Sequence, residues 1–231
     1  MHSEPEFTAD LTGFEGTVPL FPLDGVVLFP HVALPLHIFE PRYRKMVADA
    51  LDGNRLIALA LPRSGPVSPA GPELNPIVCV GRITAEERLA GGRYNIVLTG
   101  LQRAELVSEL VTDLPYRVGE LELLPDEYRD DLSIDLEVRQ EELLKSFRRL
   151  MKTGRSDSLF QQMLDADLPL GVLCDLLVAA LKVAPVDKYR ALAEVDVERR
   201  SEFLLRTIHA LSSEGQPQRR PVKYPPRFSL N

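Results

Sequence analysis

The spacing of apolar residues changes near residue 125, and this change limits the possible folds more than any other feature of the chain. Up to about Leu124 the chain consists of short apolar runs separated by glycine and proline, which is typical of β-strands and turns. From about Asp126 apolar residues recur every three to four positions, which indicates amphipathic helices. The sequence therefore predicts an α+β protein in which a strand-rich part precedes a helical part.

Seven apolar runs in the first part are predicted strands. The Gly91-Gly92 pair between two of them predicts a tight hairpin turn, because glycine tolerates the positive φ angles that such turns need. Residues 62–76 contain five prolines and two glycines, which favours a long surface loop. The predicted strands are Val18–Phe21, Val26–Phe29, Leu34–Phe39, Leu56–Leu61, Ile77–Val80, Asn95–Leu101 and Tyr116–Leu124.

One helix is predicted among these strands. Pro41 fits the first helical position, where a missing N–H has no cost, and Gly53 ends the segment. Four apolar residues between them share one face at helical spacing, namely Tyr43, Met46, Val47 and Ala50.

Five helical segments are predicted in the second part. The third, Leu170–Val183, has only Asp175 and Lys182 as charged residues, so we expect it at the centre of a helical bundle. A proline-rich, basic tail follows Gly215 and is expected to be extended. The apolar positions are Leu136, Leu143, Phe147 and Leu150 in the first segment, Leu159, Met163 and Leu164 in the second, Tyr189 and Leu192 in the fourth, and Leu204, Ile208 and Leu211 in the fifth.

Four parts of the chain follow from these patterns. We expect an N-terminal extension over residues 1–16, a β domain over 17–125, a helical bundle over 126–213 and a basic, proline-rich tail over 214–231.

The formal charge is −7, which disfavours nucleic-acid binding because phosphate contacts need a basic surface. No apolar run approaches the ~18 residues of a membrane span, so no membrane partner is expected.

The side chains that usually perform catalysis do not form a recognisable set. The sequence has no GxxxxGK[ST] phosphate loop and no Ser-x-x-Lys pair, so we expect no enzyme, no catalytic residues and no cofactor. His31 and His37 lack neighbouring ligands at zinc spacing, so no metal site is expected. Cys79 and Cys174 lie in apolar segments and form no disulfide framework, which favours core positions and a cytoplasmic location.

Several segments carry a family resemblance. Together they closely resemble the N-terminal, substrate-binding domain of the ATP-dependent Lon protease. At Pro30-His31 this family often has Pro-Gly, so we expect a different turn there. The matching segments are VPLFPLDGVVLFP at 18–30, LPLHIFEPRYR at 34–44, VGRI at 80–83, GRYNIVLTG at 92–100 and YRVGEL at 116–121.

The resemblance implies both a fold and a function. The fold is a PUA-like β pseudo-barrel with one inserted helix, followed by a C-terminal helical bundle. The function is non-catalytic recognition of unfolded or tagged polypeptides, with a protease as a further partner. Because the ATPase and the Ser/Lys peptidase of full Lon are missing from these 231 residues, we expect a stand-alone recognition protein.

The candidate peptide-binding residues lie in and beside the FEPRYR segment. Binding is expected to combine apolar contacts with strand addition at an exposed edge of the β domain. The candidates are Phe39, Glu40, Arg42, Tyr43 and Tyr94.

Local packing of the same segment can also be predicted. We expect Phe39 and Tyr43 to pack the first helix on the sheet, and Glu40 to accept hydrogen bonds from the first free N–H groups of that helix. Arg42 and Arg44 are expected to pair with acids elsewhere in the barrel.

Two alternative functions stay open at this point. PUA-like folds also occur in RNA-interacting proteins, so a nucleic-acid-binding protein is one alternative. An enzyme with a site of dispersed residues is the other. Self-association into a homo-oligomer through the helical part is also left open.

Overall fold

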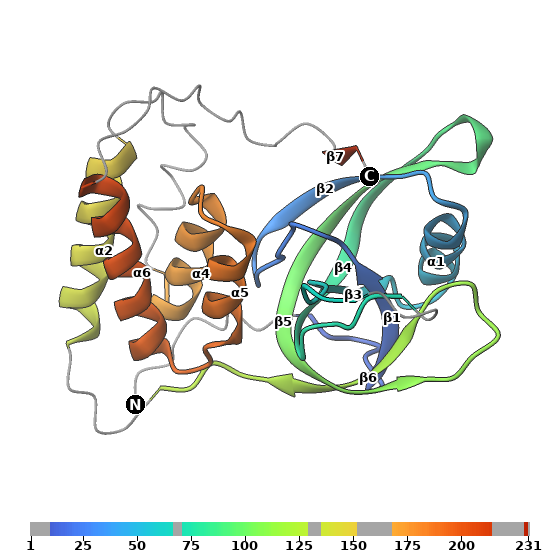
Figure 1. Ribbon diagram of the computed structural model, residues 1–231, viewed down its shortest axis with the longest axis horizontal. Helices are drawn as coiled ribbons and strands as arrows, with labels where there is room; N and C mark the ends of the chain where they lie inside the picture. The colour runs from blue at the N-terminus through green and yellow to red at the C-terminus, as the bar shows by residue number, and fades with distance from the viewer. Residues whose placement is uncertain (1–9, 67–70, 129–134, 152–167, 214–228, 231) are drawn as a thin grey trace.

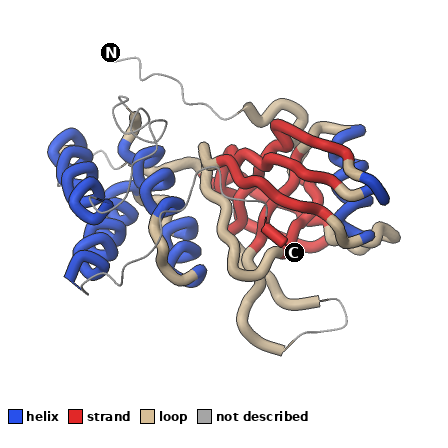
Figure 2. Tube along the Cα trace, turned by 90° about the horizontal axis from the view of Figure 1, so that it is seen from above, coloured by secondary structure: helices blue, strands red, loops and turns tan. Residues whose placement is uncertain are grey.

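The strands gather at one end of the molecule and most helices at the other, as the computed structural model shows (Figure 1). The structure describes residues 10–66, 71–128, 135–151, 168–213 and 229–230. One helix, α1, lies on the far side of the strands from the remaining helices (Figure 2). The predicted α+β class is therefore confirmed.

The strands form one sheet that closes on itself. The strand order is β4-β3-β1-β6-β5-β2-β7, and an additional β4–β5 pairing closes five of these strands into a barrel. β1–β3 and β2–β7 are the parallel pairs, and the other pairs are antiparallel. The strands are β1 Thr17–Pro22, β2 Ala33–Ile38, β3 Leu56–Ala60, β4 Ile77–Arg88, β5 Tyr94–Leu110, β6 Val118–Leu124 and β7 Ser229–Leu230.

One predicted strand is wrong. Val26–Phe29 belongs to a loop, although Leu28 and Phe29 are fully buried. After this loop, two backbone hydrogen bonds join the chain to Gly100 of β5. His31 donates to the Gly100 carbonyl over 2.8 Å, and Gly100 donates to the Val32 carbonyl over 2.9 Å. The apolar run thus fills the core as irregular chain, because burial requires apolar side chains but no ladder of hydrogen bonds.

The turns agree with the residue types found there. Gly91 and Gly92 have φ angles of 75° and 72° in the β4–β5 hairpin, as predicted. His31 has a φ of 64°, so it holds the left-handed conformation that glycine adopts freely. The expectation of a turn different from that of the family stays a prediction. Within residues 62–76, Pro62 and Leu74 form an isolated antiparallel bridge, so this loop includes a short strand-like pairing.

The helical part contains a nearly all-apolar centre, as predicted. Nine of the eleven residues of α4 are buried. The segment predicted around Leu159, Met163 and Leu164 lies outside the described residues, as does Gly215. The helices are α1 Pro41–Asp52, α2 Leu136–Met151, α4 Leu170–Ala180, α5 Pro185–Ala193 and α6 Val197–Ser213. None of the helices in the described ranges combines the length and apolar character needed to cross a membrane.

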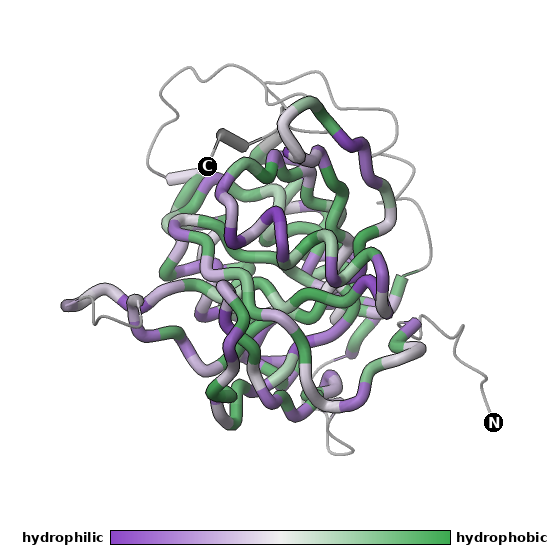
Figure 3. The backbone as a smooth tube through the Cα atoms, turned by 90° about the vertical axis from the view of Figure 1, so that its right-hand side faces the viewer, coloured by the Kyte–Doolittle hydropathy of each residue, from purple (hydrophilic) through white to green (hydrophobic). Residues whose placement is uncertain are grey.

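The largest cluster of apolar core residues extends from the barrel into the helices. One cluster of buried residues includes Phe29 and Leu98 of the barrel together with Leu143, Cys174 and Leu204 of the helices. A second cluster, around Leu20 and Val80, is formed by alternate residues of the same strands: Leu20 neighbours Phe21 of the first cluster in β1, and Val80 neighbours Cys79 in β4. Viewed onto the α1 end, hydrophobic segments cross the interior while many outer turns are hydrophilic (Figure 3).

Candidate functional site

The chain turns from β2 into α1 at Phe39 and Glu40, and we call this turn the β2–α1 corner. Phe39 is 40% exposed, which is unusual for so large an apolar side chain. A hollow of about 10 Å³ beside it is lined by Phe21, His37, Ile38, Phe39, Glu40 and Tyr43. Small-molecule pockets usually measure ~300–1,000 Å³, so the corner offers a surface contact and no enclosed pocket.

The two tyrosines among the candidates lie beneath this surface. Tyr43 is 7% exposed, and its ring lies 4.6 Å from the ring of Phe21, so it packs α1 on the sheet as predicted. Tyr94 is 5% exposed and pairs with Ile38, the residue before Phe39. The structure thus brings all five candidates to one place, but Phe39, Glu40 and Arg42 are the ones that reach the surface.

Two local expectations at the corner are wrong. Phe39 does not pack α1 on the sheet but faces solvent. The Glu40 carboxylate accepts no hydrogen bond from the backbone N–H groups of the helix, whose first residue, Pro41, has none to offer. Its carboxylate instead pairs with Arg42 at 2.9 Å.

The two arginines also find closer partners than predicted. Besides pairing with Glu40, Arg42 places its guanidinium 4.5 Å from the centre of the Tyr43 ring. Arg44 donates to the carbonyl of Gly91 over 2.9 Å and so ties α1 to the β4–β5 hairpin. Both side chains therefore hold the corner and its neighbouring turn in place.

β2 leads into the corner and has one open edge. Over its whole length one side pairs with β5, whereas the other side pairs, within the described residues, with the two-residue strand β7 alone. Pro35, in the middle of β2, lacks a backbone N–H and is typical of an edge strand. A backbone edge that ends beside an exposed aromatic ring can accept an extended polypeptide.

His37 links this edge to the corner. Its Nδ1 lies 2.8 Å from Oδ1 of Asn95, and its ring stacks with that of Phe39 at 6.1 Å between centroids. Asn95 in turn donates to Glu87 over 2.8 Å. The orientation of Phe39 is therefore supported by a polar chain that crosses from β2 to β5 and β4.

A second exposed apolar patch lies at the turn between β5 and β6. It consists of Val107, Leu110, Val111 and Leu114, which we call the hairpin patch. Sequence reasoning assigned no role to this stretch. The available signal was two Leu-Val pairs four residues apart before a turn containing Asp113 and Pro115.

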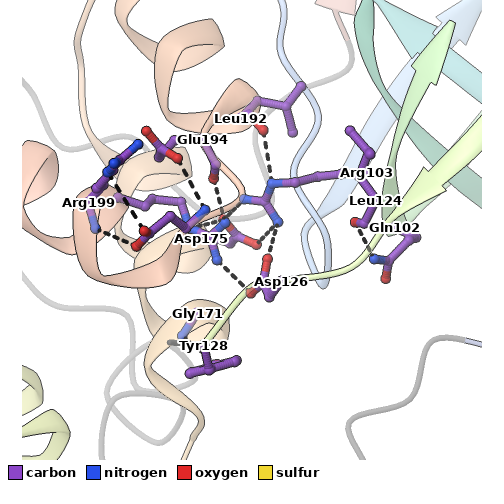
Figure 4. A network of polar contacts seen from close by, with 12 residues as sticks. Gln102, Arg103, Leu124, Asp126, Tyr128, Gly171, Asp175, Leu192, Glu194 and Arg199 are labelled. Carbon is purple, nitrogen blue, oxygen red and sulfur yellow. Dashed lines mark hydrogen bonds and ion pairs between the residues drawn. The ribbon is translucent and has the colours of Figure 1, made fainter. Parts of the chain in front are cut away.

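A buried network of charges connects the barrel to the helices, and the sequence did not predict it (Figure 4). Arg103 of β5 makes two hydrogen bonds to Asp175 of α4, one of them over 2.9 Å, and donates to the carbonyl of Leu192 over 2.9 Å. Arg200 of α6 pairs with Asp126, which also contacts Arg103 at 3.2 Å. Arg103 and Asp175 are each 2% exposed in their side chains, so this network is structural and out of reach of a ligand.

The pKa values within this region follow from burial and charge. Burial lowers the pKa of Arg200, but the charges of Asp175 and Asp126 outweigh it and raise that pKa above its usual value. Burial raises the pKa of Cys79 and of Cys174 to about 12, so both thiols stay protonated. Both cysteines are free and buried, as the sequence predicted.

The described residues contain no group of three or more His, Cys, Asp or Glu side chains placed to hold a metal ion. A shallow groove of about 300 Å³ does lie between α2 and α6. It is lined by Leu205 and by charges that already face one another: Arg139 lies 3.7 Å from Glu142, and Arg206 lies 4.0 Å from Glu202. Glu142, Glu202 and Arg206 are exposed, and surface pairs of this kind contribute little to stability.

Comparison with known sequences points to one family. Residues 17–210 match the family model of the ATP-dependent protease La (LON) substrate-binding domain. The Lon protease of Desulfosudis oleivorans is 26% identical over 211 residues, which cover 89% of this chain and 25% of that protein. Lon protease 2 of Sorangium cellulosum is 29% identical over 198 residues, covering 83% of this chain and 24% of that protein. The chain thus spans about a quarter of the length of these relatives.

Comparison with solved structures gives the same fold. A Lon N-terminal domain protein from Xanthomonas campestris has a TM-score of 0.61 at 24% identity, covering 82% of this chain and 97% of the other. The N-terminal domain of a Mycobacterium avium complex Lon protease has a TM-score of 0.64 at 17% identity, covering 87% of this chain and all of the other.

Proposed function

This chain belongs to the family of the Lon protease substrate-binding domain, and on that premise we propose that it binds unfolded or tagged polypeptides at the β2–α1 corner. The polypeptide lies extended along the open edge of β2, and an apolar side chain of it contacts Phe39. The chain itself performs no catalysis in this proposal. It delivers bound polypeptide to a separate protease, and it acts in the cytoplasm.

The observation that carries this proposal is the exposed ring of Phe39 at the end of an open strand edge. Backbone N–H and C=O groups are common to all polypeptides, so strand addition gives affinity without sequence specificity. An exposed aromatic ring adds apolar contact area, and aromatic residues often dominate the affinity of such surfaces. Together the two features suit a protein that must bind many unrelated chains.

Two charged side chains, Glu40 and Arg42, lie beside Phe39 and pair with one another. Glu40 and Arg42 neutralise one another at 2.9 Å, so the rim of the corner carries no net charge. We assign Glu40 and Arg42 to the rim of the binding surface, and Tyr43 and Tyr94 to its support. A neutral rim is consistent with recognition of polypeptides of either charge.

The hairpin patch is the second candidate surface, because it exposes four large apolar side chains close together in sequence. β5 pairs with β6 along this hairpin, and its pairing with β4 ends at Glu105, but the patch consists of aliphatic side chains and has no exposed aromatic ring like that of Phe39. It therefore serves as the matched comparison for the corner.

Titration of reduced, carboxymethylated α-lactalbumin, a permanently unfolded protein, tests the proposal. We expect saturable binding by the full chain, weakened roughly tenfold by Phe39→Ser, because an aromatic anchor contributes ~1–2 kcal/mol. Val111→Ser in the hairpin patch is the matched control and should leave the affinity unchanged. Circular dichroism of each variant checks that it is folded.

Two outcomes would contradict this assignment. Absence of saturable binding up to high micromolar concentration would remove the proposed function. Loss of affinity in Val111→Ser but not in Phe39→Ser would move the binding surface to the hairpin patch.

A further inference from the structure

The edge of β2 beside the corner already carries a piece of this chain. Ser229 and Leu230 form β7 and pair in parallel with β2, Ser229 with Leu36 and Leu230 with His37. Figure 1 shows β7 lying against β2, far in sequence from the rest of the sheet. His37 is also the residue whose ring stacks on Phe39, so the pairing reaches the proposed binding surface.

We propose that Ser229–Leu230 is an internal occupant of the β2 edge, which a polypeptide must displace before it can add to that edge. The occupant is a named segment of this chain, and the surface that it covers is the backbone of β2. The competition rests on the proposed function, whereas the pairing of β7 with β2 does not.

The length of β7 suits a removable occupant. Two paired residues make few ladder hydrogen bonds, and each such bond has a modest net strength in water. A longer extended polypeptide can pair along all of β2 and contact Phe39 as well. The covalent link compensates for the short pairing, because a tethered segment has a high effective concentration at its site.

The charge of the last residues favours the same arrangement. Residues 214–231 hold four bases and one acid, whereas residues 1–213 hold 33 acids and 23 bases. Opposite net charges attract one another without requiring a specific ion pair, and added salt weakens such an attraction. The occupant is therefore expected to be released more readily at high ionic strength.

Proline substitution in the full chain tests the proposal. Ser229→Pro with Leu230→Pro removes the two backbone N–H groups of β7 while keeping the length and charge of the tail. Gln218→Pro, in the same tail but outside β7, is the matched control. Amide hydrogen exchange of residues 33–38 and affinity for carboxymethylated α-lactalbumin are measured for each variant.

We expect the double variant to exchange faster at residues 33–38 and to bind the unfolded protein three- to tenfold more tightly, with the control unchanged. A synthetic peptide of residues 214–231 should compete with the unfolded protein for the double variant. The same peptide with proline at positions 229 and 230 should not.

The outcomes separate the two proposals. Unchanged exchange at β2 in the double variant would overturn the assigned occupancy. Faster exchange with unchanged affinity would overturn the competition. Faster exchange without polypeptide binding by any variant would contradict both the proposed function and the competition. The pairing of β7 with β2 would still be supported by the exchange data.

Discussion

Asp175 is the single charged residue of α4, and the fold explains it through residues far away in the sequence. Its carboxylate meets Arg103, 72 positions earlier, and lies 3.7 Å from Nε of Arg200. A buried carboxylate without partners would be strongly unfavourable, so the apolar helix and the arginines depend on one another. The sequence predicts an apolar centre for the helical bundle, whereas the structure places a buried group of charged residues there.

Asp175→Ala should lower the free energy of unfolding by about 3–5 kcal/mol, because it leaves Arg103 buried without its main partner. Urea unfolding followed by circular dichroism measures this change. Asp187→Ala, which removes the exposed 3.3 Å pair with Arg190, is the control and should cost less than about 1 kcal/mol. Equal effects of the two substitutions would show that the buried network does not stabilise the fold.

His31 should make stability depend on pH. Burial lowers the pKa of its imidazole, although the charges of Asp175 and Asp126 oppose this shift. In the unfolded chain the imidazole of His31 has its ordinary pKa of about 6.5, so it takes up a proton at a higher pH than in the folded chain. The free energy of unfolding therefore falls as pH falls below about 6.5.

The variant His31→Asn tests this dependence. Asparagine does not titrate, and it tolerates the positive φ at this position. The free energy of unfolding, measured between pH 7.5 and pH 5, should fall less steeply in the variant than in the parent. Parallel curves would show that His31 is not the responsible group.

At the scale of elements, the sequence predicted the buried face of α1 correctly, but it predicted one strand that is a loop and did not predict β7. The α1 face of Tyr43, Met46, Val47 and Ala50 is buried as its spacing indicated. Val26–Phe29 has the composition of a strand but remains a loop, and within it the carbonyl of Phe29 accepts a local backbone hydrogen bond from the N–H of Val32 over 3.2 Å. The pairing of β7 with β2 could not be foreseen, because a two-residue strand leaves no periodic pattern.

At the scale of the whole molecule, the barrel and the helices share one core. The main apolar cluster contains residues of both, and Ile77 at the start of β4 donates its backbone N–H to the hydroxyl of Tyr189 on α5 over 3.2 Å. The charge network around Arg103 crosses the same boundary. Neither part can separate from the other without exposing apolar surface and unpaired charges.

The chain should therefore unfold in a single transition. Far-ultraviolet circular dichroism, dominated by the helices, and tyrosine fluorescence, to which Tyr43, Tyr94 and Tyr116 of the strand-rich part contribute, should give the same midpoint in urea. Two separate midpoints would instead support independent folding of residues 17–125 and 126–213, the two domains that the sequence predicts.

The sequence by itself determined the order of strand-rich and helical parts, the face of α1 and the buried places of Cys79 and Cys174. These depend on local spacing and on apolar character, which any window of the chain displays. The tertiary structure alone decided that Phe39 faces solvent, that Asp175 meets Arg103, and that β7 covers the edge of β2. Each of these depends on segments distant in sequence, and which ones meet is decided by how the complete chain packs its core and pairs its buried polar groups.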